Sequence, residues 1–202
     1  MPKRSEKFLA ERKLELASAA MRCFNRKGFH ATSIPDICEE AGVSIGTLYK
    51  YFDGKHGMWM TALEQNFDNG KPFEQCQTWT EFRDLMIGEL PSVDDSESLG
   101  YLAGVLEISA DALRDRQLTD RGALQAQKTH KYLTAQLLRF KRAGEISLPL
   151  GAEVSERTIR SIVLGAKTQY YLESLVPKRT FKKDIVRTLN YLVGAVESSA
   201  NN

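Results

Sequence analysis

The sequence predicts an all-α protein of about nine helices, and three observations support this fold class. Apolar residues recur every three or four positions over most of the 202 residues, and no segment shows the two-residue alternation of a half-buried strand. Glycine and proline fall between these periodic segments, where helices end. Around Gly42, two short helices are expected to flank a tight turn, which is a helix-turn-helix pattern.

The helix-turn-helix is expected at residues 33–52. Ser33 is a suitable N-cap for its first helix, and Gly42 tolerates the left-handed conformation that ends that helix. Ser44 then caps a second helix that is expected to run to about Phe52. Small and apolar residues occupy the positions where the two helices must pack, namely Ile37, Cys38, Ala41, Val43, Leu48 and Tyr51. The second helix is left with a polar face that can enter the major groove of DNA.

The other helices follow from the same spacing. One precedes the motif at about 16–24, and six follow it at about 55–70, 80–90, 99–113, 126–140, 155–175 and 180–198. Pro91 ends the second of these six, and the polar stretch 92–98 is expected to be a loop. Gly144 ends the helix at 126–140, and Pro177 separates the last two helices.

Composition and charge narrow the function classes. Residues 1–57 carry ten Lys and Arg against seven Asp and Glu, whereas residues 58–202 carry eighteen against nineteen. The small positive excess therefore lies with the helix-turn-helix, where phosphates would require it. No segment is apolar for the ~18 residues of a membrane span, and no signal peptide is visible at the N-terminus. The three cysteines show no paired spacing, so free thiols in a reducing cytoplasm are expected.

No catalytic or metal-binding motif is present. The chain lacks a nucleophile elbow, a P-loop, a dinucleotide-binding glycine pattern and a zinc-protease motif. The three histidines have no cysteine or carboxylate at ligand spacing. We therefore expect neither an enzyme nor a metal ion or other cofactor.

The N-terminal quarter of the chain resembles the TetR (tetracycline-repressor) family of bacterial transcription regulators over roughly residues 10 to 58. The segments that carry the resemblance are Leu16-Ala-Ser-Ala-Ala-Met-Arg-Cys-Phe24, Gly28-Phe29, Thr32-Ser33, Ala41-Gly-Val-Ser44, Gly46-Thr-Leu-Tyr49, Tyr51-Phe52 and Lys55. Three positions depart from the pattern, because Cys38, His56 and Gly57 replace residues that are more usual there. The resemblance implies a three-helix DNA-binding domain at 1–58 and a helical ligand-binding and dimerisation domain at 59–202.

Nine residues are candidates for contact with DNA. Thr47 and Ile45 can meet a thymine methyl group, and Lys50 can reach guanine or a phosphate. Gly46 permits the protein backbone to approach DNA closely. The remaining candidates, all expected at phosphates, are Ser33, Ser44, Tyr49, Tyr51 and Lys55. Three of these residues can instead have an ordinary structural role. Tyr51 can pack in the core of the domain, and Lys50 or Lys55 can be a solvated surface charge. Lys3 and Arg4 can follow DNA as an arm or remain a free terminus.

The last two expected helices are apolar on more than one face, which predicts that a second subunit covers them. In the resembling family the last two helices pair with their symmetry mates as a four-helix bundle. The candidate interface comprises Gly165, Ala166, Tyr171, Val186, Leu189, Val193 and Gly194. The alternative is that these helices are simply central in one chain.

The resemblance also implies a pocket for a small, largely apolar effector in the larger domain. Candidate wall residues are Trp59, Trp79, Phe82, Met86, Tyr101, His130 and Tyr170. Each of them can instead be an ordinary core residue, and His130 can be satisfied by a neighbouring polar group.

These features predict a ligand-responsive repressor that binds a palindromic operator of double-stranded DNA as a homodimer, with no membrane partner. One alternative is an architectural DNA-binding dimer without an effector. Another is a helical small-molecule-binding protein or enzyme that has lost its operator, which the intact segment 44–50 disfavours.

Overall fold

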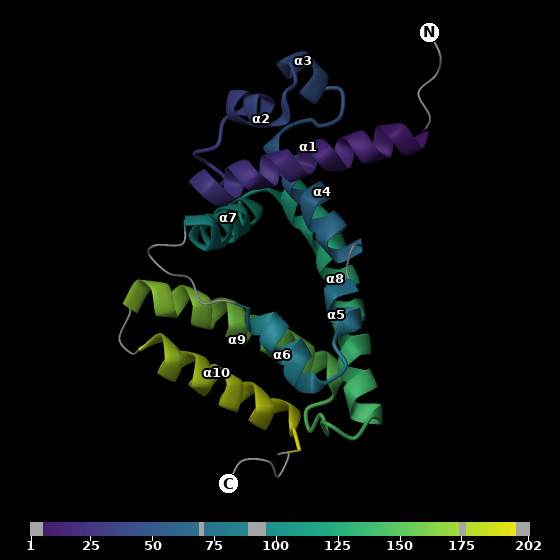
Figure 1. Ribbon diagram of the computed structural model, residues 1–202, viewed down its shortest axis with the longest axis vertical. Coiled ribbons are helices and arrows are strands. Elements are labelled where there is room, and N and C mark those ends of the chain that lie inside the picture. Colours follow the sequence, from purple (N-terminus) through teal and green to yellow (C-terminus); the bar gives the residue numbers. More distant parts are fainter. Residues whose placement is uncertain (1–5, 69–70, 89–95, 174–176, 197–202) are drawn as a thin grey trace. The chain divides into compact units, whose positions relative to one another are not determined.

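The computed structural model describes residues 6–68, 71–88, 96–173 and 177–196, and within these ranges the chain is helical (Figure 1). The elements are α1 (Glu6–Lys27), α2 (Ile34–Ala41), α3 (Ile45–Leu48), α4 (Lys55–Asp68), α5 (Lys71–Gln75), α6 (Trp79–Ile87), α7 (Ser96–Ala112), α8 (Arg116–Arg142), α9 (Ala152–Glu173) and α10 (Lys178–Val193). The all-α prediction is confirmed, and the ten helices agree with the expected number of about nine. No described helix is long and apolar enough to cross a membrane.

The chain forms two compact units that differ from the predicted domains. Unit 1 comprises Met1–Gly70 and Ser92–Ala123, and unit 2 comprises Lys71–Pro91 and Leu124–Asn202. The predicted boundary at residue 58 divides α4 after its first turn, whereas the structure packs the helix against α1 in one unit. The predicted first domain also omitted α7, which lies against α1 in the same unit.

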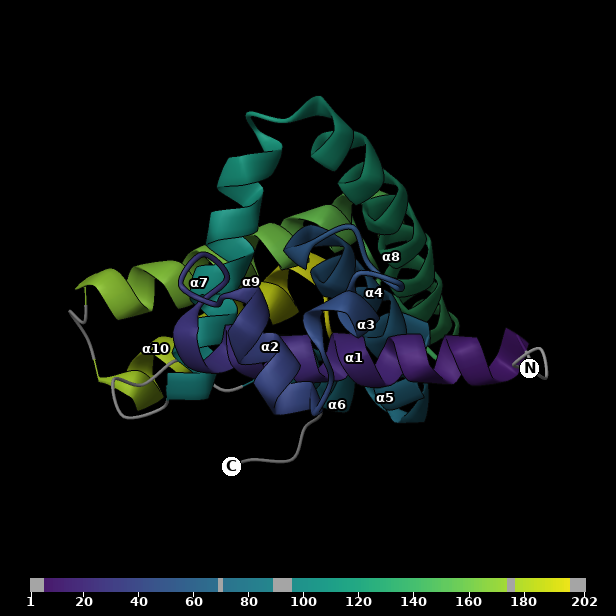
Figure 2. The ribbon, with the colours of Figure 1, turned by 90° about the horizontal axis from the view of Figure 1, so that it is seen from above.

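Unit 1 is built around α1. The helices α2 and α3 lie on one side of α1, and α4 and α7 lie on the other (Figures 1 and 2). The buried stripe of α1 recurs at helical spacing, at Leu16, Ala20 and Phe24, and these side chains pack in one core with residues of α2, α3 and α4. Phe24, Phe29 and Trp59 form its aromatic centre, with ring centroids 5.1–6.0 Å apart. This core holds the helix-turn-helix on α1.

Two glycines allow α7 to come very close to the rest of unit 1. A Cβ atom added at Gly100 would overlap the backbone carbonyl of Asn25 near the end of α1. A Cβ atom at Gly104 would lie 2.7 Å from the indole ring of Trp59. Only glycine fits both positions without a shift of its neighbours, so α7 is an integral wall of this unit.

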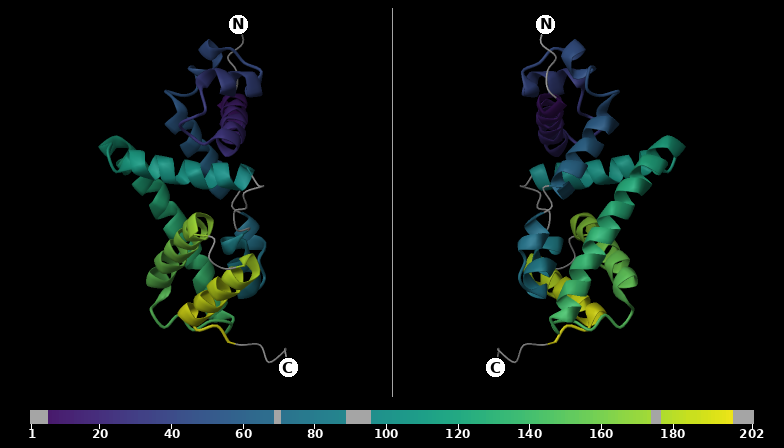
Figure 3. Two further views of the ribbon diagram at one scale, coloured as in Figure 1. Left: turned by 90° about the vertical axis from the view of Figure 1, so that its left-hand side faces the viewer. Right: turned by 90° about the vertical axis from the view of Figure 1, so that its right-hand side faces the viewer.

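Unit 2 contains α5, α6, most of α8, α9 and α10. In it α9 and α10 lie side by side, with α6 against both (Figures 1 and 3). Its apolar core includes Phe82, Leu137, Phe140, Leu189 and Val193. The Asn190 side-chain oxygen joins α10 to α6, because it accepts hydrogen bonds from the Trp79 indole and the Arg83 guanidinium, both at 2.9 Å.

Several element boundaries differ from the prediction. The helix α5 was not predicted, since its five residues carry no apolar repeat. The helix α3 ends at Leu48, because Lys50 and Tyr51 bond to carbonyls only three residues back. The helix α8 begins at Arg116, ten residues before the expected start, because Asp115 accepts hydrogen bonds from the amides of Gln117 and Leu118.

The predicted loop 92–98 is shorter than expected, since α7 begins at Ser96. The last helix ends at Val193, five residues before the expected 198, because Gly194 takes a left-handed conformation with φ 59°. The expectations for Pro91, residues 92–95 and the arm Lys3–Arg4 lie outside the described residues.

Candidate nucleic-acid interface

The helix α2 is capped at both ends as the sequence predicts. Ser33 is extended and accepts a hydrogen bond from the Asp36 amide, and the Asp36 carboxylate accepts one from the Ser33 amide at 2.8 Å. Gly42 has φ 63° and donates its amide to carbonyls of the last turn. The chain therefore reverses within two residues and enters α3 directly.

The helix α3 presents one face to the core and another to solvent. Leu48 is fully buried, and Ser44 caps the helix by accepting a hydrogen bond from the Thr47 amide. Ile45 and Gly46 of α3 are exposed, and so are Tyr49 and Lys50 in the turn that follows it, with Ile45 at 47% and Tyr49 at 53%. The described residues place no ion-pair partner at Lys50. This surface, defined by these four residues, is called the reading face below.

Four other predicted contact residues are already engaged within the domain. The Thr47 and Ser44 hydroxyls lie 3.0 Å apart in a hydrogen bond, and the Ser33 hydroxyl donates to Asp36 at 2.7 Å. Tyr51 is half-buried and packs against the core of unit 1. Both serine hydroxyls remain exposed, so each can still accept or donate a further hydrogen bond at the surface.

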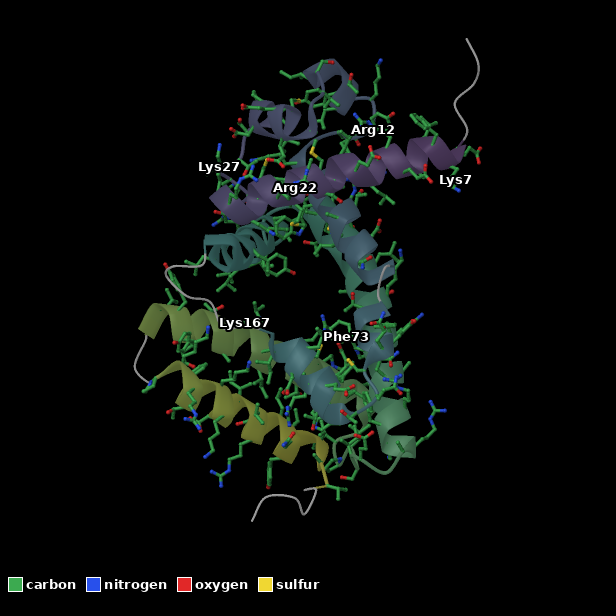
Figure 4. The ribbon with its side chains drawn as sticks, viewed as in Figure 1. Lys7, Arg12, Arg22, Lys27, Phe73 and Lys167 are labelled. Carbon is green, nitrogen blue, oxygen red and sulfur yellow. The ribbon has the colours of Figure 1, made fainter. Side chains whose placement is uncertain are left out.

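Ion pairs between α1 and α2 fix the approach of the motif, and the sequence did not predict them. Glu40 pairs with Arg22 at 2.7 Å and Arg26 at 2.6 Å, and Asp36 pairs with Lys27 at 2.7 Å. Arg22 and Lys27 project from α1 (Figure 4). The only available signal was the cluster of bases ending α1 before an acidic α2.

These pairs also set the charge state of the two carboxyls. Hydrogen bonds from Lys27 and then Ser33 hold the pKa of Asp36 well below its usual range. The guanidinium groups of Arg22 and Arg26 lower the pKa of Glu40. Because both pKa values are lower in the folded state, the pairs stabilise it above the ordinary carboxyl pKa, and this contribution is lost as the pH falls into the acid range.

Lys55 does not extend toward solvent as a phosphate ligand would. Its ammonium donates to the backbone carbonyls of Phe29 at 2.7 Å, His30 at 3.2 Å and Thr32 at 2.8 Å, and it lies 4.8 Å from the centroid of the Phe29 ring. Burial lowers the pKa of Lys55, while Glu107 and Asp111 act in the opposite direction. All three N–H donors are used, so the predicted phosphate role is replaced by an anchoring role for the loop between α1 and α2.

Lys55→Met should loosen this loop and lower the free energy of unfolding by about 1–3 kcal/mol, because it removes hydrogen bonds from a charged donor. Urea unfolding followed by circular dichroism measures the loss, and Lys50→Met is the matched control at an exposed site. The salt dependence of DNA binding should keep its wild-type slope in Lys55→Met. A shallower slope with unchanged stability would restore the phosphate role.

The predicted wall of an effector pocket does not come together in either unit. Trp59 and Tyr101 belong to unit 1, where their rings stack with centroids 6.1 Å apart. The other five belong to unit 2, where Trp79 and Phe82 are buried in the core, Met86 packs against it and Tyr170 packs on Phe181. His130 hydrogen-bonds through Nδ1 to the buried carboxylate of Glu156, which Arg160 also approaches.

The predicted dimer residues separate into buried and exposed sets. Leu189 and Val193 are fully buried inside unit 2 and are not available to a partner, whereas half-buried Gly194 ends α10 with φ 59° and lines an open groove. Ala166 and Val186 are half-buried against the same core. Gly165 and Tyr171 remain exposed on α9.

No group of three or more His, Cys, Asp or Glu residues is placed to hold a metal ion within the part of the chain that the structure describes.

Taken together, the capped α2, the tight reversal at Gly42 and the exposed side of α3 define a helix-turn-helix domain. Residues 16–59 match the family of bacterial regulatory proteins, tetR family. This helix-turn-helix domain is therefore of the tetR family type, and the predicted resemblance is confirmed.

The relatives and solved structures agree with this placement. The HTH-type transcriptional regulator BetI of Vibrio campbellii is 51% identical over 54 residues, which are 27% of each chain. The matched stretches span about a third or less of the length of the curated relatives. A TetR-family regulator from Rhodococcus sp. superposes with TM-score 0.71 and 19% identity over 91% of this chain and 98% of the other. A transcriptional regulator from Saccharomonospora viridis in complex with choline gives TM-score 0.66 and 15% identity over 90% and 96%. These structural likenesses extend the shared fold to both units.

Proposed function

We propose that this chain is a bacterial, cytoplasmic transcription regulator that binds a palindromic operator as a homodimer and releases it when a small effector binds. The reading face of α3 is the observation that carries the proposal. It combines the hydroxyl of Tyr49, the ammonium of Lys50, the apolar side chain of Ile45 and Gly46. The other side of α3 packs into the core of unit 1 through Leu48. No sequence motif for catalysis competes with this role.

The chemistry of the reading face suits a major groove. Tyr49 and Lys50 can donate to phosphates or base acceptors, and Ile45 can pack on a thymine methyl. Gly46 has open space around its Cα, so it allows the backbone to approach DNA closely. The exposed hydroxyls of Ser33 and Ser44 lie at the N-termini of α2 and α3, where phosphates are favoured. Sequence specificity then depends on α3, and the N-termini of α2 and α3 fix the position of the protein along the DNA.

Tyr49→Ala and Lys50→Ala should each weaken operator binding by about 1–3 kcal/mol and leave the free energy of unfolding nearly unchanged, because both side chains are exposed. Selection of bound fragments from genomic DNA identifies the operator, and titration of each variant by fluorescence anisotropy gives the affinity. Glu39→Ala, an exposed change on α2 away from the reading face, is the control. Wild-type affinity in both variants would remove α3 from direct contact with DNA.

The homodimer is supported by the outer side of unit 2. Leu164 is exposed on α9, and Tyr171 and Leu172 are exposed about two turns after it. An open groove of unit 2 also has apolar residues in its lining, among them Leu150, Ile162, Leu192 and Ala195. Such a surface favours pairing over exposure to water. Two copies related by a two-fold axis would present two reading faces about 34–36 Å apart, which suits a palindromic operator.

The proposed effector is a small organic molecule. A structural neighbour holds choline, which supports a small organic effector in a protein of this fold. An architectural DNA-binding dimer is the second candidate, because five of the seven predicted wall residues already pack in the core of their own unit. Release of operator DNA on addition of choline or of another compound in a metabolite panel would favour the effector-responsive regulator. Unchanged binding throughout such a panel would favour the architectural dimer.

A further inference from the structure

One face of α7 carries two glycines followed by two carboxylates. Gly100, Gly104, Glu107 and Asp111 are spaced by four, three and four residues, so they lie along a single side of the helix. The glycines bring this side against Asn25 and Trp59, as described above. The carboxylates extend the same contact line toward the loop at residues 28–32, which joins α1 to α2.

Both carboxylates contact this loop. Glu107 accepts a hydrogen bond from the backbone amide of His30 at 2.9 Å, and its other oxygen lies beside Gly28. Asp111 lies between two imidazoles, with one oxygen 3.5 Å from Nε2 of His30 and the other 3.2 Å from Nε2 of His56. A single carboxylate of α7 therefore bridges the loop and α4.

The loop is held from two sides. Lys55 of α4 binds its carbonyls, and Glu107 of α7 binds its amide. The loop leads directly into Ser33, which caps α2, and α2 leads through Gly42 into α3. A displacement of α7 must therefore either break these bonds or move the start of the helix-turn-helix with it.

We propose that Glu107 and Asp111 are positioning residues through which α7 sets the pose of the helix-turn-helix. The inference rests on the proposed DNA-binding function and adds the residues that hold the reading face in place. Neither carboxylate touches DNA in this scheme. Each fixes the loop at 28–32, so that the state of α7 determines which orientation of α2 and α3 is stable.

The main test compares operator affinities of the full-length dimer. Asp111→Asn and Glu107→Ala should change the affinity about 5- to 150-fold, the usual range of coupling between sites. Asp120→Asn is the matched control, because it removes one charge at an exposed position on α8. Affinities are measured at a temperature where circular dichroism shows every variant fully folded. A pair that only stabilises the fold would lower the melting temperature and leave the affinity of the folded protein unchanged.

Two further measurements make the test decisive. The double variant Asp111→Asn with His56→Gln should be non-additive in operator affinity, since the two residues act through one contact. Hydrogen exchange at residues 28–33 should accelerate in Glu107→Ala without DNA. If the wild type binds DNA while both single variants match Asp120→Asn, the positioning role is overturned and the proposed function stands. Failure of the wild type to bind any selected DNA would instead overturn the proposed function.

Discussion

Replacing Trp59 with alanine is expected to lower the free energy of unfolding of unit 1 by about 3–5 kcal/mol. The indole is 2% exposed, packs on Phe24 and Phe29, and fills the space that Gly104 leaves open on α7. Its removal would leave a cavity where α1, α4 and α7 meet, and a close-packed core relaxes only partly around such a void.

Urea unfolding of Trp59→Ala, followed by circular dichroism, measures this loss. Tyr101→Phe is the control, because it keeps the ring that stacks on Trp59 and changes only the hydroxyl. A loss below about 1 kcal/mol would show that the Trp59 side chain contributes little to the core. The role predicted from the sequence, as part of the wall of an effector pocket, would then explain Trp59 better.

The second large effect is expected at the proposed dimer interface. Leu164→Glu should weaken dimerisation by about 3–5 kcal/mol, because a two-fold axis introduces the unpaired charge twice into one interface. Such a change corresponds to about a hundredfold or more in Kd. Operator binding should fall with it, since one protomer presents one reading face.

Leu138→Glu provides a matched control for this experiment. Leu138 lies on α8 and is 42% exposed, close to the 40% of Leu164, so the two substitutions carry the same change at similar exposure. Light scattering at micromolar concentration should show a dimer for the wild type and the control. A monomeric wild type with full operator affinity would contradict the homodimer.

The helix-turn-helix was predictable because its determinants are local. Ser33, Gly42 and Ser44 act on residues within one turn of themselves, so the sequence alone indicates where α2 and α3 begin and where α2 ends. The exposure of Ile45 and Tyr49 beside buried Leu48 was less predictable, because residues three and four apart share one side of a helix and only the packing of Leu48 into the core of unit 1 separates them.

The roles of Lys55 and Asn190 could not be predicted, because their partners are remote in sequence. Lys55 binds carbonyls 23–26 residues away, and Asn190 accepts hydrogen bonds from groups more than 100 residues away. Nothing in the composition of either segment distinguishes an anchored lysine from a solvated one.

The wrong assignments at Leu189 and Val193 have a related cause. A helix that is apolar on several faces must be covered on several sides, but periodicity does not show which side meets the same chain. The structure buries these residues within unit 2 and leaves the outer side of α9 exposed.

The division of the chain into two units also bears on how such regulators can be recombined. Each unit is built from two separate segments, so the polypeptide passes from one to the other three times. A chimera joined at residue 58 would pair the new N-terminal segment with a foreign α7, whose residue at position 100 would have to fit against the backbone of residue 25 in place of Gly100. An exchange of operator specificity between related proteins should therefore transfer residues 96–123 together with the helix-turn-helix domain. Gly100, Gly104, Glu107 and Asp111 then come from the same protein as the loop at residues 28–32.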